Sequence, residues 1–182
     1  MKRVFISIFL VLALGMAFVL KATAGAREDN LVYSAADGDL DNVRKLLDLG
    51  VDVNAKESKL GCTALIAATQ SNHTSVVRLL LARGANPSTP CNALGIEGNT
   101  ALILAADDGN AEVVRMLIAK GAEVNMKTEL GTTALMAATD KLKQGQSTGM
   151  DSSFHVTYRP LTPAETKAYT DIVGMLKAAG AQ

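Results

Sequence analysis

The fold is decided by a motif that occurs three times: TALIAA at residues 63–68, TALILAA at 100–106 and TALMAA at 133–138. Fifteen residues after the first two threonines come Arg78 and Arg115, each inside a Val-Val-Arg-(Leu/Met)-Leu segment. Repetition at such a spacing is typical of proteins in which each unit packs only on its neighbours. The sequence therefore predicts a stack of similar units.

Each unit carries the signals of two short helices. The opening threonine is suited to cap the first helix, because its side chain can accept a bond from an amide of the first turn. The alanine pairs permit close approach of a neighbouring helix. Glycines suited to a positive φ follow both helices, as at Gly109 after the first and Gly121 after the second. We expect a helix, a tight turn and a second helix in every unit.

A further copy lies upstream of these three. Asp29 stands at the position of the opening threonine, and a Val-Arg-Lys-Leu-Leu segment at 43–47 leads to Gly50. The sequence thus predicts about four units, with approximate bounds at 27–57, 58–95, 96–128 and 129–182. Four units give three interfaces, enough for a stable stack.

The segments GVDVNAK at 50–56 and GAEVNMK at 121–127 follow the second helices. With the motifs above, they resemble the ankyrin repeat over residues 27–182. The resemblance implies an all-α repeat solenoid, in which each repeat has a β-turn finger and an antiparallel helix pair, and a role in binding another protein. The chain departs from the family pattern by replacing the usual proline and histidine of the motif with Ala64, Ala101 and Ala134 and with Ile66, Ile103 and Met136.

Two deviations from the period indicate where specificity lies, since insertions map to loops. The finger between Gly84 and Thr100 is longer than the others. The fourth repeat carries an insertion of 26 residues at about 141–166. Within it, 144–151 predicts a loop, 154–159 alternates like an extended segment, and the Thr-Pro-Ala-Glu run at 162–165 predicts the start of a last helix over 163–179.

Candidate partner-binding residues lie in the fingers and the insertion: Leu60, Leu94, Ile96, Leu130, Phe154, Tyr158 and Arg159. The three leucines precede a glycine at matching finger-tip positions, and aromatic and arginine side chains are favoured interface anchors. Two alternatives stay open. The leucines could pack locally within their turns, and the insertion could fold over the open end of the solenoid, which would make Phe154 and Tyr158 part of the core.

Cys62 and Cys91 are the only cysteines. Stacking of adjacent repeats could bring them together, and a disulfide between them would contribute about 3 kcal/mol if unstrained. An oxidising compartment would allow such a pair.

The first 24 residues have the parts of a secretory signal: basic Lys2 and Arg3, an apolar run over 4–20, and small residues up to Ala24. We expect cleavage there and a periplasmic or secreted protein. The alternative is an uncleaved membrane anchor over 4–20, because the run approaches the length of a membrane span.

Charge and motif content indicate what the chain does not do. Without residues 1–24, 15 basic and 18 acidic residues remain, which does not favour nucleic-acid binding. No nucleophile with a base, phosphate loop or metal-ligand spacing is present, so we expect no enzyme, cofactor or metal site. The prediction is a monomeric, non-catalytic module that binds a protein, with a membrane-tethered scaffold as the alternative.

Overall fold

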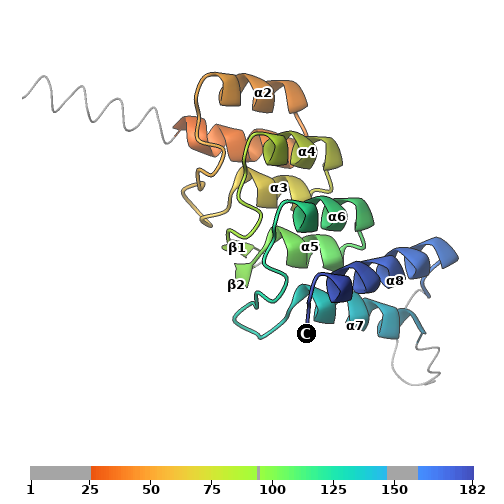
Figure 1. Ribbon diagram of the computed structural model, residues 1–182. Coiled ribbons are helices and arrows are strands. Elements are labelled where there is room, and N and C mark those ends of the chain that lie inside the picture. The colour runs from red at the N-terminus through yellow and green to blue at the C-terminus, as the bar shows by residue number, and fades with distance from the viewer. Residues whose placement is uncertain (1–25, 94, 147–159) are drawn as a thin grey trace, which may run out of the picture.

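The computed structural model describes residues 26–93, 95–146 and 160–182, which form a stack of helix pairs (Figure 1). A first helix includes residues 26–37. The remaining elements are α2 (Leu40–Asp48), α3 (Ala64–Gln70), α4 (Thr74–Ala82), β1 (Cys91–Ala93), β2 (Ile96–Asn99), α5 (Ala101–Asp107), α6 (Ala111–Ala119), α7 (Ala134–Gln146) and α8 (Pro163–Ala178). The predicted all-α repeat solenoid is confirmed, with a short hairpin, β1–β2, added in the second finger.

The helices form two layers. We call the first helix of each pair (26–37, α3, α5, α7) an inner helix and the second (α2, α4, α6, α8) an outer helix. Inner helices pack on inner helices along the stack, and outer helices on outer helices. Every residue of α3 and α5 except the last is buried. Small alanines at these positions allow this close packing, as the sequence predicts.

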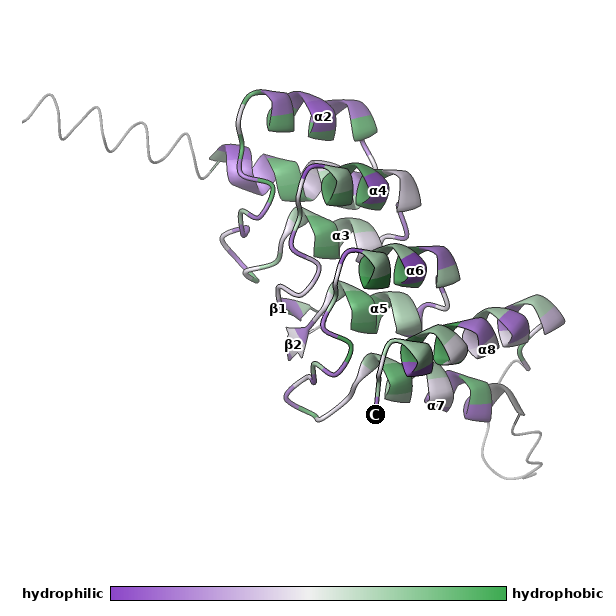
Figure 2. Ribbon diagram, viewed as in Figure 1, coloured by the Kyte–Doolittle hydropathy of each residue, from purple (hydrophilic) through white to green (hydrophobic). Residues whose placement is uncertain are grey.

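One continuous core contains the motif leucines Leu65 and Leu102 and the corresponding Leu31, all fully buried, with Val76 and Val113 of the outer helices. The leucine of the fourth-repeat motif is partly buried and packs against this core. The outer layer is polar at the N-terminal end of the stack, where α2 is mainly hydrophilic (Figure 2). Burying each apolar face needs a neighbouring repeat, so the stack is stabilised mainly by contacts between repeats.

The caps of the inner helices differ from the prediction at two positions. The Thr100 and Thr133 hydroxyls accept bonds from the amides of Ile103 and Met136, as predicted. Among the described residues, the Thr63 hydroxyl caps no amide and is buried without a hydrogen-bond partner. Asp29 lies within the first helix, and its carboxylate accepts bonds from the amide and hydroxyl of Ser58 in the first finger. The upstream repeat begins earlier than the motif suggests, which frees Asp29 for this contact.

In repeats 2, 3 and 4, one equivalent residue contacts the preceding repeat. His73, Asn110 and Tyr169 each lie eleven residues before the glycine that ends the repeat. The His73 ring lies against Gly38, the Asn110 amide donates to the Asn72 side chain, and the Tyr169 ring lies against Gly109. This position therefore joins the turn between the two helices of one repeat to the following repeat.

Both helices of the fourth repeat, α7 and α8, are longer than α2 to α6. The predicted loop at 144–151 is wrong in its first residues, because α7 continues through Gln146. The predicted last helix is confirmed: α8 starts at Pro163 with a capping box between Thr162 and Glu165. Because α8 begins early, Tyr169 stands inside it where other repeats have a helix N-cap. Residues 147–159 lie outside the described part of the chain.

Candidate functional site

Two leucines project from the fingers, the segments 51–62, 85–99 and 122–132 that link the repeats (fingers 1, 2 and 3). Leu60 at the tip of finger 1 is 53% exposed, and Leu130 at the tip of finger 3 is 70% exposed. The sequence left two alternatives, local packing within the turn and exposure at the finger tip. The structure shows exposure for both leucines. Ile96 in finger 2 is half-buried, and Leu94 lies outside the described residues. We call Leu60 and Leu130 the finger-tip leucines.

A buried carboxylate shapes finger 1. Glu57 is only 6% exposed, and its carboxylate accepts bonds from the amides of Lys59, Leu60 and Cys62. Such charge-assisted bonds are stronger than those between neutral groups and satisfy amides that the turn would leave unpaired. The Glu57 side chain thus accepts the backbone amide bonds of this turn and fixes the backbone that carries Leu60.

The fingers are joined to one another through their backbones. The Asn92 amide of finger 2 donates to the Leu60 carbonyl at 3.3 Å, and the Glu129 amide of finger 3 donates to the Glu97 carbonyl at 3.0 Å. Leu60 and Glu97 hold the same position, three residues before the opening threonine. The fingers therefore form a connected platform along one edge of the stack (Figure 1).

A disulfide strengthens one junction of this platform. Cys62 of finger 1 and Cys91 of β1 are bonded, with Cα atoms 4.8 Å apart, and both are buried. Burial of both sulfurs indicates a structural bond, because reactive cysteines need access to solvent. The bond holds finger 1 against finger 2 beside Leu60.

Three of the predicted partner-binding residues belong to the insertion. Phe154, Tyr158 and Arg159 of the insertion lie outside the described residues, so their role stays a prediction. Conversely, Glu57 and Tyr169 were missed as organising residues. The equal distance of Tyr169, Asn110 and His73 from their terminal glycines was the available signal for Tyr169.

The shifted titrations of this region follow from packing. Burial, and then the neighbouring Asp107, raises the pKa of Asp108. Burial, followed by the charges of Asp107, Asp108 and Glu165, raises the pKa of Tyr169, whose hydroxyl donates to the Asp107 carbonyl at 2.8 Å. Both groups belong to the turn between α5 and α6 and to its contact with α8. Their arrangement explains a structural contact and offers no nucleophile with a base.

Within residues 26–93, 95–146 and 160–182, no group of three or more histidine, cysteine, aspartate or glutamate side chains could hold a metal ion. In the same ranges, no helix has the length and apolar character that crossing a membrane requires.

Paired helices joined by stacked fingers define a helical repeat solenoid, and comparison with known proteins gives its family. The family model described as ankyrin repeats (3 copies) matches residues 15–91, 31–128 and 88–147. The chain belongs to the ankyrin-repeat family. Ankyrin repeats are generally non-catalytic modules for protein–protein interaction.

Similar curated proteins share only a short part of their length with this chain. An ankyrin repeat-containing protein of Saccharomyces cerevisiae is 44% identical over 57 residues, 31% of this chain and 11% of that protein. The human mitochondrial disaggregase is 45% identical over 58 residues (32% and 8%), and the mouse 2-5A-dependent ribonuclease is 38% identical over 60 residues (33% and 8%). The chain therefore spans about a tenth of these relatives, and the activities in their names are theirs.

Proposed function

We propose that this chain is an exported, non-catalytic module that binds one partner protein through its finger platform. The observation that carries the proposal is the pair of finger-tip leucines, which are large, apolar and exposed on backbone that is fixed from several sides. Preorganised apolar anchors lose little entropy on binding and are typical of interface centres. The charges of neighbouring Lys56, Lys59 and Glu129 would supply a polar rim.

The experiment removes the anchors without touching the core. The tagged chain is crosslinked in extracts of its native host, and the captured proteins are identified by mass spectrometry. Leu60→Ser with Leu130→Ser should abolish capture of the partner. Leu49→Ser is the matched control: Leu49 is 60% exposed but ends α2, outside the fingers. Equal capture by both variants would refute the role of the finger tips.

The insertion is tested in a separate arm of the same experiment. If the insertion belongs to the binding surface, capture should weaken in a variant that combines Phe154→Ala, Tyr158→Ala and Arg159→Ala. Unchanged capture would remove these residues from the proposal and leave the finger platform as the site.

Export is tested by the mass of the protein in its host. Cleavage after Ala24 or Ala26 would support a periplasmic or secreted module, and the oxidising environment there is consistent with the Cys62–Cys91 bond. An intact N-terminus in the membrane fraction would favour the tethered scaffold instead.

A further inference from the structure

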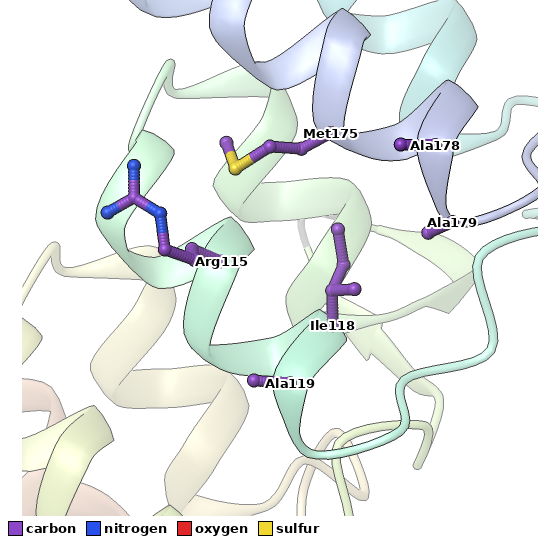
Figure 3. Close-up of a pocket in the computed structure, with 6 residues that line it drawn as sticks. All are labelled: Arg115, Ile118, Ala119, Met175, Ala178 and Ala179. Atoms are coloured by element: carbon purple, nitrogen blue, oxygen red, sulfur yellow. The ribbon is translucent and has the colours of Figure 1, made fainter.

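The outer layer contains a second surface, away from the finger tips. A groove of about 350 Å³ runs between α6 and α8 and is lined by Arg115, Ile118, Ala119, Met175, Ala178 and Ala179 (Figure 3). Its volume lies at the lower end of the range for binding sites, about 300–1,000 Å³. Three of its residues are alanines, so the backbones of both helices are accessible to a closely packed neighbour.

The preceding pair of outer helices provides an internal comparison. A groove of about 250 Å³ between α4 and α6 is lined by Arg78, Leu81, Ala82, Met116, Ala119 and Lys120. These are the matching positions one repeat earlier. The lining differs most at its end, where Lys120 of the α4/α6 groove is replaced by Ala179. The α6/α8 groove is therefore larger and has one cation instead of two.

The two arginines also differ in their partners. Arg78 forms an ion pair with Glu112 of the next outer helix. The matching acid for Arg115 is Asp171 of α8, but Lys167 holds Asp171 at 2.7 Å. Among the described residues, no acid pairs with Arg115. Figure 3 shows its side chain extending along one end of the groove, beside Met175. Within the described part of the chain, this guanidinium thus has no acidic partner and borders an apolar floor.

We propose that the α6/α8 groove binds an amphipathic helix of a partner protein, with an apolar side chain on Ile118 and Met175 and an acidic side chain against Arg115. A helix fits because its apolar ridge can enter a groove between two helices whose small residues permit close packing. The acid belongs at the Arg115 end, because α6 and α8 both finish near Ala119 and Ala178 and their C-termini carry partial negative charge. This site is independent of the finger platform.

The test uses peptide probes and nuclear magnetic resonance, which detects weak binding. The ¹⁵N-labelled full chain is titrated with a helical peptide that carries two leucines four residues apart and a glutamate one turn before them. A second peptide has glutamine in place of the glutamate. We expect shifts at Ile118, Ala119, Ala178 and Ala179, and a Kd about tenfold weaker for the glutamine peptide, as loss of one charge-assisted bond implies.

Matched variants assign the effect to the proposed contacts. Arg115→Gln should remove the preference for glutamate, whereas Arg78→Gln, at the same position one repeat earlier, should keep it. Lys167→Met frees Asp171 to neutralise Arg115 and should weaken binding of the glutamate peptide severalfold. Ala178→Leu should block the groove, and Ala82→Leu in the α4/α6 groove should not.

Three results would overturn the inference. One is the absence of shifts at the groove, and another is equal affinity for the glutamate and glutamine peptides. The third is a set of groove shifts that depend on protein concentration without peptide, since these would assign the surface to contact between two copies of the chain. None of these outcomes bears on the finger-tip variants, so the two proposals fail separately.

Discussion

Neighbouring repeats are held together by different contacts at the two ends of the stack. Toward the N-terminus, the Cys62–Cys91 disulfide joins finger 1 to finger 2 at the edge of the platform. Toward the C-terminus, Tyr169 of α8 reaches back to the Asp107 carbonyl and covers Gly109. The first tie is covalent and lies at the fingers. The second is a hydrogen bond and ring contact at the opposite end of the helices.

The difference shows how an insertion is tolerated. Residues added between α7 and α8 lengthen both helices, yet Tyr169 falls at the position where His73 and Asn110 contact the preceding repeat. Because that contact is kept, the extra residues do not disturb packing on α6. Removing the disulfide and the Tyr169 contact separately measures how much each contributes to stability.

The largest expected effect comes from the covalent tie. Cys62→Ala with Cys91→Ala should lower the free energy of unfolding by about 3 kcal/mol, because the unfolded chain is no longer constrained by a loop of roughly thirty residues. Urea denaturation measures the loss. Reductant should destabilise the natural chain and leave the double variant unchanged. An unfolding curve that neither change shifts would show that the two sulfurs are not joined in solution.

Removing the Tyr169 contact should lower the free energy of unfolding less than removing the disulfide does. Tyr169→Phe leaves the Asp107 carbonyl without its donor and should lower the free energy of unfolding by about 1 kcal/mol. Tyr33→Phe, an exposed tyrosine of the first helix, is the control and should have no effect.

The pH dependence of this contact has a defined sign. Since folding raises the pKa of Tyr169, the folded chain retains the phenol proton that the unfolded chain loses. Stability should therefore fall as pH rises above about 10, the ordinary tyrosine pKa, and fall less steeply in Tyr169→Phe. Parallel curves for the two proteins would contradict this.

Replacing Gly174 tests how much a glycine inside α8 lowers the stability of the chain. It lies inside the helix, and a Cβ built on it would meet no atom within 4 Å. Gly174→Ala should raise the free energy of unfolding by about 0.8 kcal/mol through helix propensity alone. Gly180→Ala is the contrasting control and should be destabilising, because Gly180 has a φ of +91°. A loss of stability in Gly174→Ala would reveal a contact that the structure does not show.

The smallest expected effect is electrostatic. Burial and Asp107 raise the pKa of Asp108, so its charge opposes folding at neutral pH, but only weakly, because the residue is exposed and solvent screens its charge. Asp108→Asn should stabilise the chain by about 0.5 kcal/mol at pH 7, helped by removal of an anion from the C-terminus of α5. The gain should vanish below about pH 4, where both states are protonated.

Asp37→Asn serves as the control for that variant. It changes the same position of the first repeat, where Ala36 stands in place of Asp107, and should therefore have a smaller effect. Thermal denaturation at both pH values gives the comparison. Equal gains from the two variants would show that Asp107 contributes nothing.

The repeat register, the glycine turns and the start of α8 could be predicted from the sequence. Each of these depends on contacts within a few residues, such as the Thr162–Glu165 capping box. The sequence also indicated the finger-tip leucines, because their positions follow the period.

Side-chain burial and the contacts between distant residues could not be predicted, because they depend on how the repeats stack. Examples among the described residues are the Glu57 carboxylate buried in its turn, the Asp29 contact with Ser58, the Tyr169 contact with Asp107 and the lack of an acidic partner for Arg115. The two contacts join residues 29 and 62 positions apart in the sequence, and Glu57 takes its role from burial in the folded finger. A local pattern carries no information on such pairings, because they exist only once the neighbouring repeats are stacked.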